Sequence, residues 1–111
     1  MPFGMGVPKT FDAPRRETRT PMEVVVHLSG HAAMPGTEAT FTENVSPHGA
    51  RVLSVRPWKK NDQLTISTLT GSFHSVARVA YCHPVPETGF AVGIEFLEPD
   101  GKWVVVNSPN T

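Results

Sequence analysis

The sequence has a single cysteine, no excess of one charge sign and no long apolar run. Cys82 is the only cysteine, so no intramolecular disulfide can form, which favours a reducing compartment. Ten basic residues balance ten acidic ones, and this neutrality argues against a general DNA-coating protein. No segment approaches the roughly 20 apolar residues of a membrane helix, and the N-terminus does not resemble a signal peptide. These absences predict a cytoplasmic protein without membrane insertion.

Helical periodicity is absent as well. Short runs rich in β-branched and aromatic residues alternate instead with Gly, Pro and polar turn residues. The predicted strands cover 22–31, 37–46, 50–56, 64–69, 73–82 and 90–97, with a short seventh run at 103–106. This pattern in 111 residues predicts one all-β domain, either a barrel or a sandwich.

The predicted strand 37–46 carries a clear alternation of apolar and polar residues. Because successive side chains of a strand point to opposite faces, one face is expected to pack inward and the other to form an outward polar stripe. The expected inward residues are Ala39, Phe41 and Val45, and the expected outward residues are Thr40, Thr42, Asn44 and Ser46.

Residues typical of catalytic or metal sites are scattered along the chain. His27 and His31 are four apart, a helical spacing, but lie in a predicted strand. Cys82 and His83 are adjacent, so a strand would point them to opposite faces. Neither a compact ligand set, nor a marked pair of carboxylates, nor a P-loop is found. We therefore predict no enzyme activity, no catalytic residue, no metal and no cofactor.

Two polar stretches remain, and they fit an anionic ligand. Arg15, Arg16 and Arg19 fall within five residues before a predicted strand. A guanidinium group binds a phosphate or the O6/N7 edge of guanine in bidentate geometry, and it also stacks on bases. The alternative is a solvated linker without a ligand. The second stretch, 44–49, ends one strand with Asn44 and Ser46 on one face, and Gly49 provides a close backbone approach or a positive φ.

Together these stretches resemble the PilZ domain family, receptors for the bacterial second messenger cyclic diguanylate (cyclic di-GMP). The family signature is R-x-x-x-R followed by D/N-x-S-x-x-G, and 24 residues separate its halves here. Arg15 and Arg19 match the first half, and Asn44, Ser46 and Gly49 match the second. The later strands, with Gly-Ala-Arg-Val at 49–52, Ala-Arg-Val at 77–79 and Val-Gly-Ile-Glu-Phe at 92–96, are also similar, so the resemblance covers roughly residues 14–98.

The resemblance implies a six-stranded antiparallel β-barrel at 15–98 with a mobile arginine loop, little or no helix, and cyclic di-GMP as ligand. Residues 1–14 would be a flexible lead-in, and 99–111 a C-terminal extension with a short strand and a frayed tail. By resemblance, Arg15 and Arg19 would grip guanine edges and phosphates, with Arg16 as a secondary charge. Asn44 and Ser46 would hydrogen-bond a guanine, and Gly49 would let the backbone turn beneath it. Asn44 departs from the commoner Asp, removing an anion that could face guanine N–H donors.

Three functions are compatible with this sequence. The first is a stand-alone cyclic di-GMP receptor or adaptor that changes conformation and signals to an unidentified effector protein, with no oligomeric state specified. The second is a protein-interaction barrel with weak or no nucleotide binding. The third is single-stranded nucleic-acid binding, but the zero net charge and 8% aromatic content argue against a nucleic acid polymer as partner.

Overall fold

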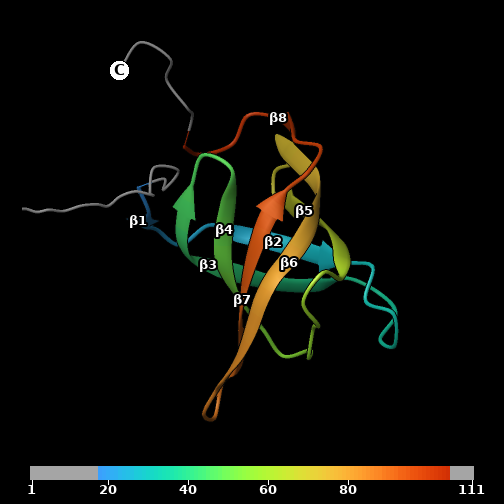
Figure 1. Ribbon diagram of the computed structural model, residues 1–111. Coiled ribbons are helices and arrows are strands. Elements are labelled where there is room, and N and C mark those ends of the chain that lie inside the picture. The colour runs from blue at the N-terminus through green and yellow to red at the C-terminus, as the bar shows by residue number, and fades with distance from the viewer. Residues whose placement is uncertain (1–17, 106–111) are drawn as a thin grey trace, which may run out of the picture.

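The computed structural model describes residues 18–105, which form eight β-strands and no helix (Figure 1). The strands are β1 (Thr20–Pro21), β2 (Val25–Ser29), β3 (Glu38–Ser46), β4 (Gly49–Ser54), β5 (Gln63–Thr68), β6 (Phe73–Val85), β7 (Gly89–Phe96) and β8 (Asp100–Gly101). Among the described residues, therefore, nothing forms a helix with the length and hydropathy needed to span a bilayer.

Six of the strands close into an antiparallel barrel. The order around it is β3-β2-β5-β6-β7-β4, and the pairing of β3 with β4 joins the two ends. The two-residue strands β1 and β8 add to β3 and β6 respectively. In Figure 1, β6 and β7 cross in front of β2 and β3. The six-stranded barrel predicted from the sequence is confirmed.

The barrel interior is filled by the inward-facing residues of the six barrel strands and by two tryptophans. Alternation is clearest in β5, where Leu64 and Ile66 are buried and Gln63 and Thr65 are exposed. Each fully buried large apolar side chain stabilises the fold by roughly 1.5–3 kcal/mol. The core comprises Val26, Leu28, Val45, Ala50, Val52, Trp58, Leu64, Ile66, Phe73, Ala77, Val79, Val92, Ile94, Phe96 and Trp103.

The predicted faces of 37–46 are wrong over much of β3. The register with β4 shifts between Thr42 and Asn44, as in a β-bulge, and such a bulge exchanges the two faces of the strand. Thr42 is therefore completely buried, whereas Ala39 and Phe41 point outward. Val45 does lie in the core, as predicted.

The predicted seventh strand is also wrong for the described residues 103–105, and Val106 lies outside the described range. The pairing residues come earlier, at β8, where Phe73 faces Gly101 and His74 faces Asp100. Trp103 instead enters the core at 7% exposure and packs against Phe73 and Phe96. Aromatic packing, rather than strand pairing, thus fixes this part of the chain.

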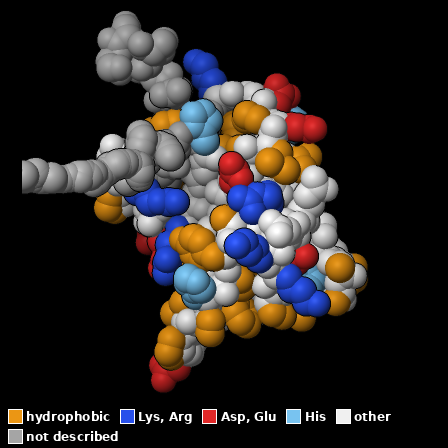
Figure 2. Space-filling model, in the orientation of Figure 1, with side chains coloured by type: hydrophobic (Ala, Val, Ile, Leu, Met, Phe, Trp, Pro, Cys, Tyr) orange, Lys and Arg blue, Asp and Glu red, His pale blue; other side chains and the backbone are white. Residues whose placement is uncertain are grey.

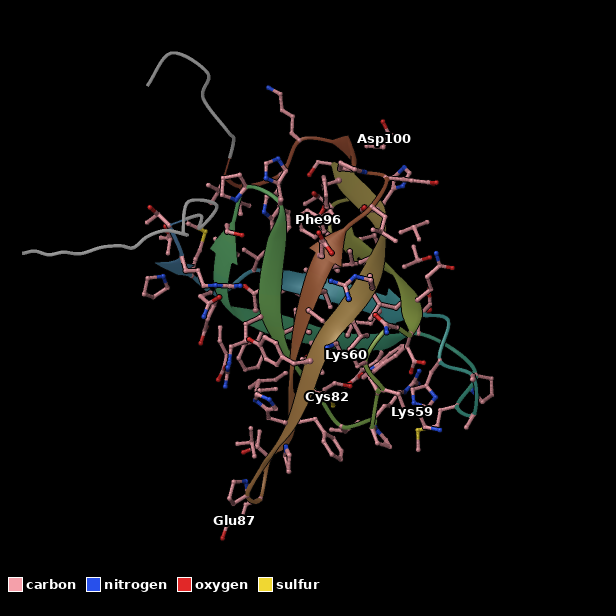
Figure 3. The ribbon with its side chains drawn as sticks, viewed as in Figure 1. Lys59, Lys60, Cys82, Glu87, Phe96 and Asp100 are labelled. Atoms are coloured by element: carbon pink, nitrogen blue, oxygen red, sulfur yellow. The ribbon has the colours of Figure 1, made fainter. Side chains whose placement is uncertain are left out.

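Most strand limits differ from the predicted ones by one to three residues, and two of the differences have local reasons. The first predicted strand begins at Val25 rather than residue 22, because Met22 and Val24 bond irregularly to β3 through Glu43 and Thr42. β6 continues to Val85 and forms a long hairpin with β7. Its tip, with Glu87, projects from the barrel, far from Phe96 on β7 (Figure 3).

Candidate functional site

The two halves of the sequence motif meet at one end of β3. Arg19 directly precedes β1, Asn44 and Ser46 end β3, and Gly49 begins β4. Arg19 Nη1 donates a hydrogen bond of 3.1 Å to Asn44 Oδ1. Arg15 and Arg16 lie outside the described residues, so Arg19 is the residue of the first half whose contact with the second half is described.

The pairing of β1 with β3 explains why Arg19 lies there. Thr20 faces Val45, and Pro21 faces Asn44. Since the strands are antiparallel, the chain before Thr20 continues along β3 toward Ser46. A two-residue strand thus sets the position of an arginine that is 25 residues from Asn44 in the sequence.

Strand register extends the site from the motif across the outside of the barrel in two adjacent rows. The first row runs from Ser46 to Gly49, then to Glu95 on β7 and Arg78 on β6. The second row runs from Asn44 to Arg51, then to Gly93 on β7 and Tyr81 on β6. Each row therefore begins with a motif residue of β3 and ends with a large side chain of β6.

A pocket of about 580 Å³ lies over these rows. Both rows have a glycine near the middle, Gly49 in the first and Gly93 in the second, and both glycines line the pocket. Basic side chains gather on the face in view in Figure 2, and an acidic side chain lies against them near its centre. The lining residues are Arg19, Ser46, His48, Gly49, Arg78, Ala80, Tyr81, Gly93, Ile94, Glu95 and Phe96.

Gly49 is required by a close approach between strands. Its φ is not among the positive values, so backbone conformation is not the reason. A Cβ at this position would overlap the carbonyl oxygen of Ile94 on β7. Of the two roles expected for Gly49, close approach is therefore the one found.

Ser46 is buried at 4% exposure, but it lines the pocket and lies next to the core residue Val45, so its side chain is covered on the outer face of the strand. Its hydroxyl donates a long hydrogen bond of 3.4 Å to the Gly49 carbonyl. Its own carbonyl accepts a 2.9 Å hydrogen bond from Trp103 Nε1. The end of β3 is thus held from inside the barrel by a core tryptophan.

Tyr81 is held flat against the second row. A Cβ on Gly93 would overlap the Tyr81 ring, so this glycine is what allows the ring to lie there. His83, two residues further along β6, stacks on the Tyr81 ring with 4.7 Å between ring centroids. The Arg51 guanidinium carbon lies 5.8 Å from the ring centroid, and Nη1 donates to the Tyr81 hydroxyl at 3.3 Å. The site therefore presents a positioned aromatic side chain.

Arg51 is also bound to Glu43, with 2.8 Å between Nε and Oε1. This hydrogen bond, followed by the one to Tyr81, raises the pKa of Arg51 above its usual value. Because that value is already far above neutrality, Arg51 is cationic throughout the physiological range. Its charge is partly offset by Glu43.

Arg78, Tyr81 and Glu95 were not among the predicted site residues. The sequence contained one signal for Glu95: with Gly93, it has the opposite parity to the alternating apolar residues Phe90, Val92, Ile94 and Phe96, and so faces outward. Alternation did not predict the outward position of Tyr81. The register of β6 with β7 shifts between Val79 and Tyr81, so the alternation of faces is interrupted just before this residue.

Within residues 18–105, no group of three or more His, Cys, Asp or Glu side chains could hold a metal ion. Cys82 is half-buried and packs against the core rather than entering the pocket. The described polar side chains that line the pocket are therefore those of arginine, serine, histidine, tyrosine and one glutamate.

Comparison with known proteins agrees with the motif and the barrel. No curated protein gave a significant match. The family model of the PilZ domain matches residues 13–102, which is most of the chain. PilZ domains are binding domains, and the family is one of cyclic di-GMP receptors. The chain belongs to the PilZ domain family.

Proposed function

We propose that this protein binds cyclic di-GMP in the pocket between Arg19 and the outer rows of β3, β4, β7 and β6. The observation that carries the proposal is that residues of both motif halves, Arg19, Ser46 and Gly49, line one pocket. Its volume of about 580 Å³ falls within the range of small-molecule sites.

The residues around the pocket fit the chemistry of this ligand. Cyclic di-GMP carries two phosphate anions and two guanines. Arg19 supplies a guanidinium fork that suits a phosphate or a guanine O6/N7 edge. Gly49 allows the close approach of β4 to β7, Gly93 accommodates the Tyr81 ring, and this ring lines the pocket as an aromatic contact for a base.

The sequence motif adds Arg15 and Arg16 to the proposed ligand-binding residues. Arg15 and Arg16 precede the pocket residue Arg19 by four and three residues in the sequence. Arg15 would bind the ligand together with Arg19, and Arg16 would add positive charge. We propose that binding changes the conformation of this segment and that an effector protein recognises the change.

Titration calorimetry of the 111-residue protein with cyclic di-GMP tests the proposal. The unmodified protein should bind, whereas Arg15→Ala and Arg19→Ala should each lose about 1–3 kcal/mol per bidentate contact. This corresponds to a roughly 5- to 150-fold weaker dissociation constant.

Lys59→Ala provides a matched control, because it removes an exposed cation outside the pocket. Its affinity should equal that of the unmodified protein. Absence of heat, together with absence of stabilisation at high ligand concentration, would refute the proposal and favour a protein-interaction barrel.

A further inference from the structure

Among the described residues, one carboxylate lines the pocket, although the proposed ligand is an anion. Glu95 projects from β7 between Gly49 of β4 and Arg78 of β6, and its side chain is 52% exposed. Its Oε1 accepts two hydrogen bonds from Arg78, of 3.0 Å from Nε and 2.8 Å from Nη2. Within residues 18–105, no hydrogen bond to Oε2 is found, which leaves that oxygen available to a ligand.

Arg78 is fixed at both ends of its guanidinium group. Besides its bonds to Glu95, Nη1 donates a 2.9 Å hydrogen bond to Asn61 Oδ1. Asn61 is itself anchored, because its backbone N–H donates to the Val79 carbonyl at 2.7 Å. Arg78 is therefore a positioning residue: it holds the carboxylate in place and offsets the negative charge that would otherwise repel a phosphate.

Asn44 cannot supply the acceptors that a motif aspartate would offer. An amide has a single acceptor oxygen, and Asn44 Oδ1 already accepts from Arg19. The Watson–Crick edge of guanine carries two adjacent donors, N1–H and the N2 amino group. The Oε2 atom of Glu95, which has two lone pairs, can accept from both donors, whereas the N1 of adenine is an acceptor and would be repelled.

We propose that Glu95 determines base specificity by accepting hydrogen bonds from the guanine N1–H and N2 amino groups. This inference rests on the proposed binding of cyclic di-GMP. The register places Glu95 beside Gly49 and two strands from Ser46, about 10 Å across the sheet. Ser46, Gly49 and Glu95 all line the pocket, and the guanine would bind there, between Ser46 and Glu95.

Calorimetry with three cyclic dinucleotides tests this role in the full 111-residue chain. Cyclic di-GMP has both donors, cyclic di-inosine monophosphate lacks the N2 amino group, and cyclic di-AMP lacks the N1–H as well. The unmodified protein should bind cyclic di-GMP about tenfold more tightly than the inosine compound, and cyclic di-AMP more weakly still.

Glu95→Gln keeps the size of the side chain but replaces one acceptor oxygen with a donor. It should weaken binding of cyclic di-GMP by about 10- to 150-fold and reduce the preference for guanine over hypoxanthine to about one. Glu98→Gln is the matched control, since it removes an exposed carboxylate three residues further on and outside the pocket. That control should keep both the affinity and the preference.

The outcomes separate this inference from the proposed function. If the unmodified protein binds cyclic di-GMP and Glu95→Gln keeps the preference for guanine, the role of Glu95 is wrong and the ligand stands. If the unmodified protein does not bind cyclic di-GMP, both are wrong. A urea unfolding midpoint for Glu95→Gln within the range of the control shows that altered binding does not arise from unfolding.

Discussion

Thr42 is a residue whose polar group is buried only because of local backbone geometry. Its side chain is completely buried at the β3 bulge. The hydroxyl donates to the Met22 carbonyl at 2.7 Å and accepts from the Val24 N–H at 2.9 Å. It thereby satisfies two backbone groups where the chain before β2 does not pair regularly with β3.

Replacing Thr42 with Val should therefore destabilise the barrel. The shape of the side chain is kept, but the partly buried Met22 carbonyl and Val24 N–H lose their partner, which costs about 1 kcal/mol for each hydrogen bond lost. Urea unfolding followed by tryptophan fluorescence should show a lower midpoint and an unchanged slope. Thr40→Val is the control: Thr40 donates to the Leu53 carbonyl but is only half-buried, so water can replace it at smaller cost. Equal midpoints for the two variants would contradict this account of Thr42.

At the scale of strands, sequence alternation predicted most elements but not their irregularities. Buried side chains alternate with outward ones through β5, so this strand was found with limits that differ by one residue. The shifts at Thr42/Asn44 and Val79/Tyr81 were not predictable. Which residue forms the bulge depends on pairing with the partner strand, and one extra residue does not visibly change the composition of a strand. The same shifts account for the wrong faces of β3 and for the failure to find Tyr81.

The β6–β7 hairpin carries a backbone conformation that its sequence does not favour. Glu87 at its tip has a φ of 67°, and Thr88 N–H donates to the Val85 carbonyl across the turn. Positive φ costs an ordinary residue roughly 1–2 kcal/mol, whereas Asn adopts it more readily. The tip therefore holds strain that one substitution can relieve.

Glu87→Asn should stabilise the protein by about 0.5–1 kcal/mol, because Asn is better suited to this turn position. The measurement is the urea midpoint, which should rise with an unchanged slope. Glu98→Asn serves as control, since Glu98 is exposed and its φ is not positive. A lower midpoint for Glu87→Asn than for that control would show that the tip is not strained.

At the scale of the whole molecule, closure of the barrel assembles the site. Arg19 comes from the beginning of the described chain and Glu95 from near its end, yet both line the same pocket. The motif at 44–49 was recognisable because its residues are close in sequence. Arg78, Tyr81 and Glu95 join it only through the pairings of β4 with β7 and β7 with β6. Long-range register of this kind is set by the closed sheet rather than by any local pattern.

Because the pocket exists only in the closed barrel, ligand binding should stabilise the whole fold. A ligand that binds only the native state at 100 times its dissociation constant adds about 2.7 kcal/mol to the free energy of unfolding. For a domain of this size, that corresponds to a rise in melting temperature of about 10–20 °C.

Thermal melting with and without cyclic di-GMP measures this coupling. Arg19→Ala at the same ligand concentration should show a much smaller shift, because weaker affinity reduces the occupancy of the native state. Lys59→Ala should keep the full shift, since Lys59 lies outside the pocket. A shift that is equally large in Arg19→Ala would place the ligand elsewhere, because Arg19 is the described residue through which the first half of the motif reaches the barrel.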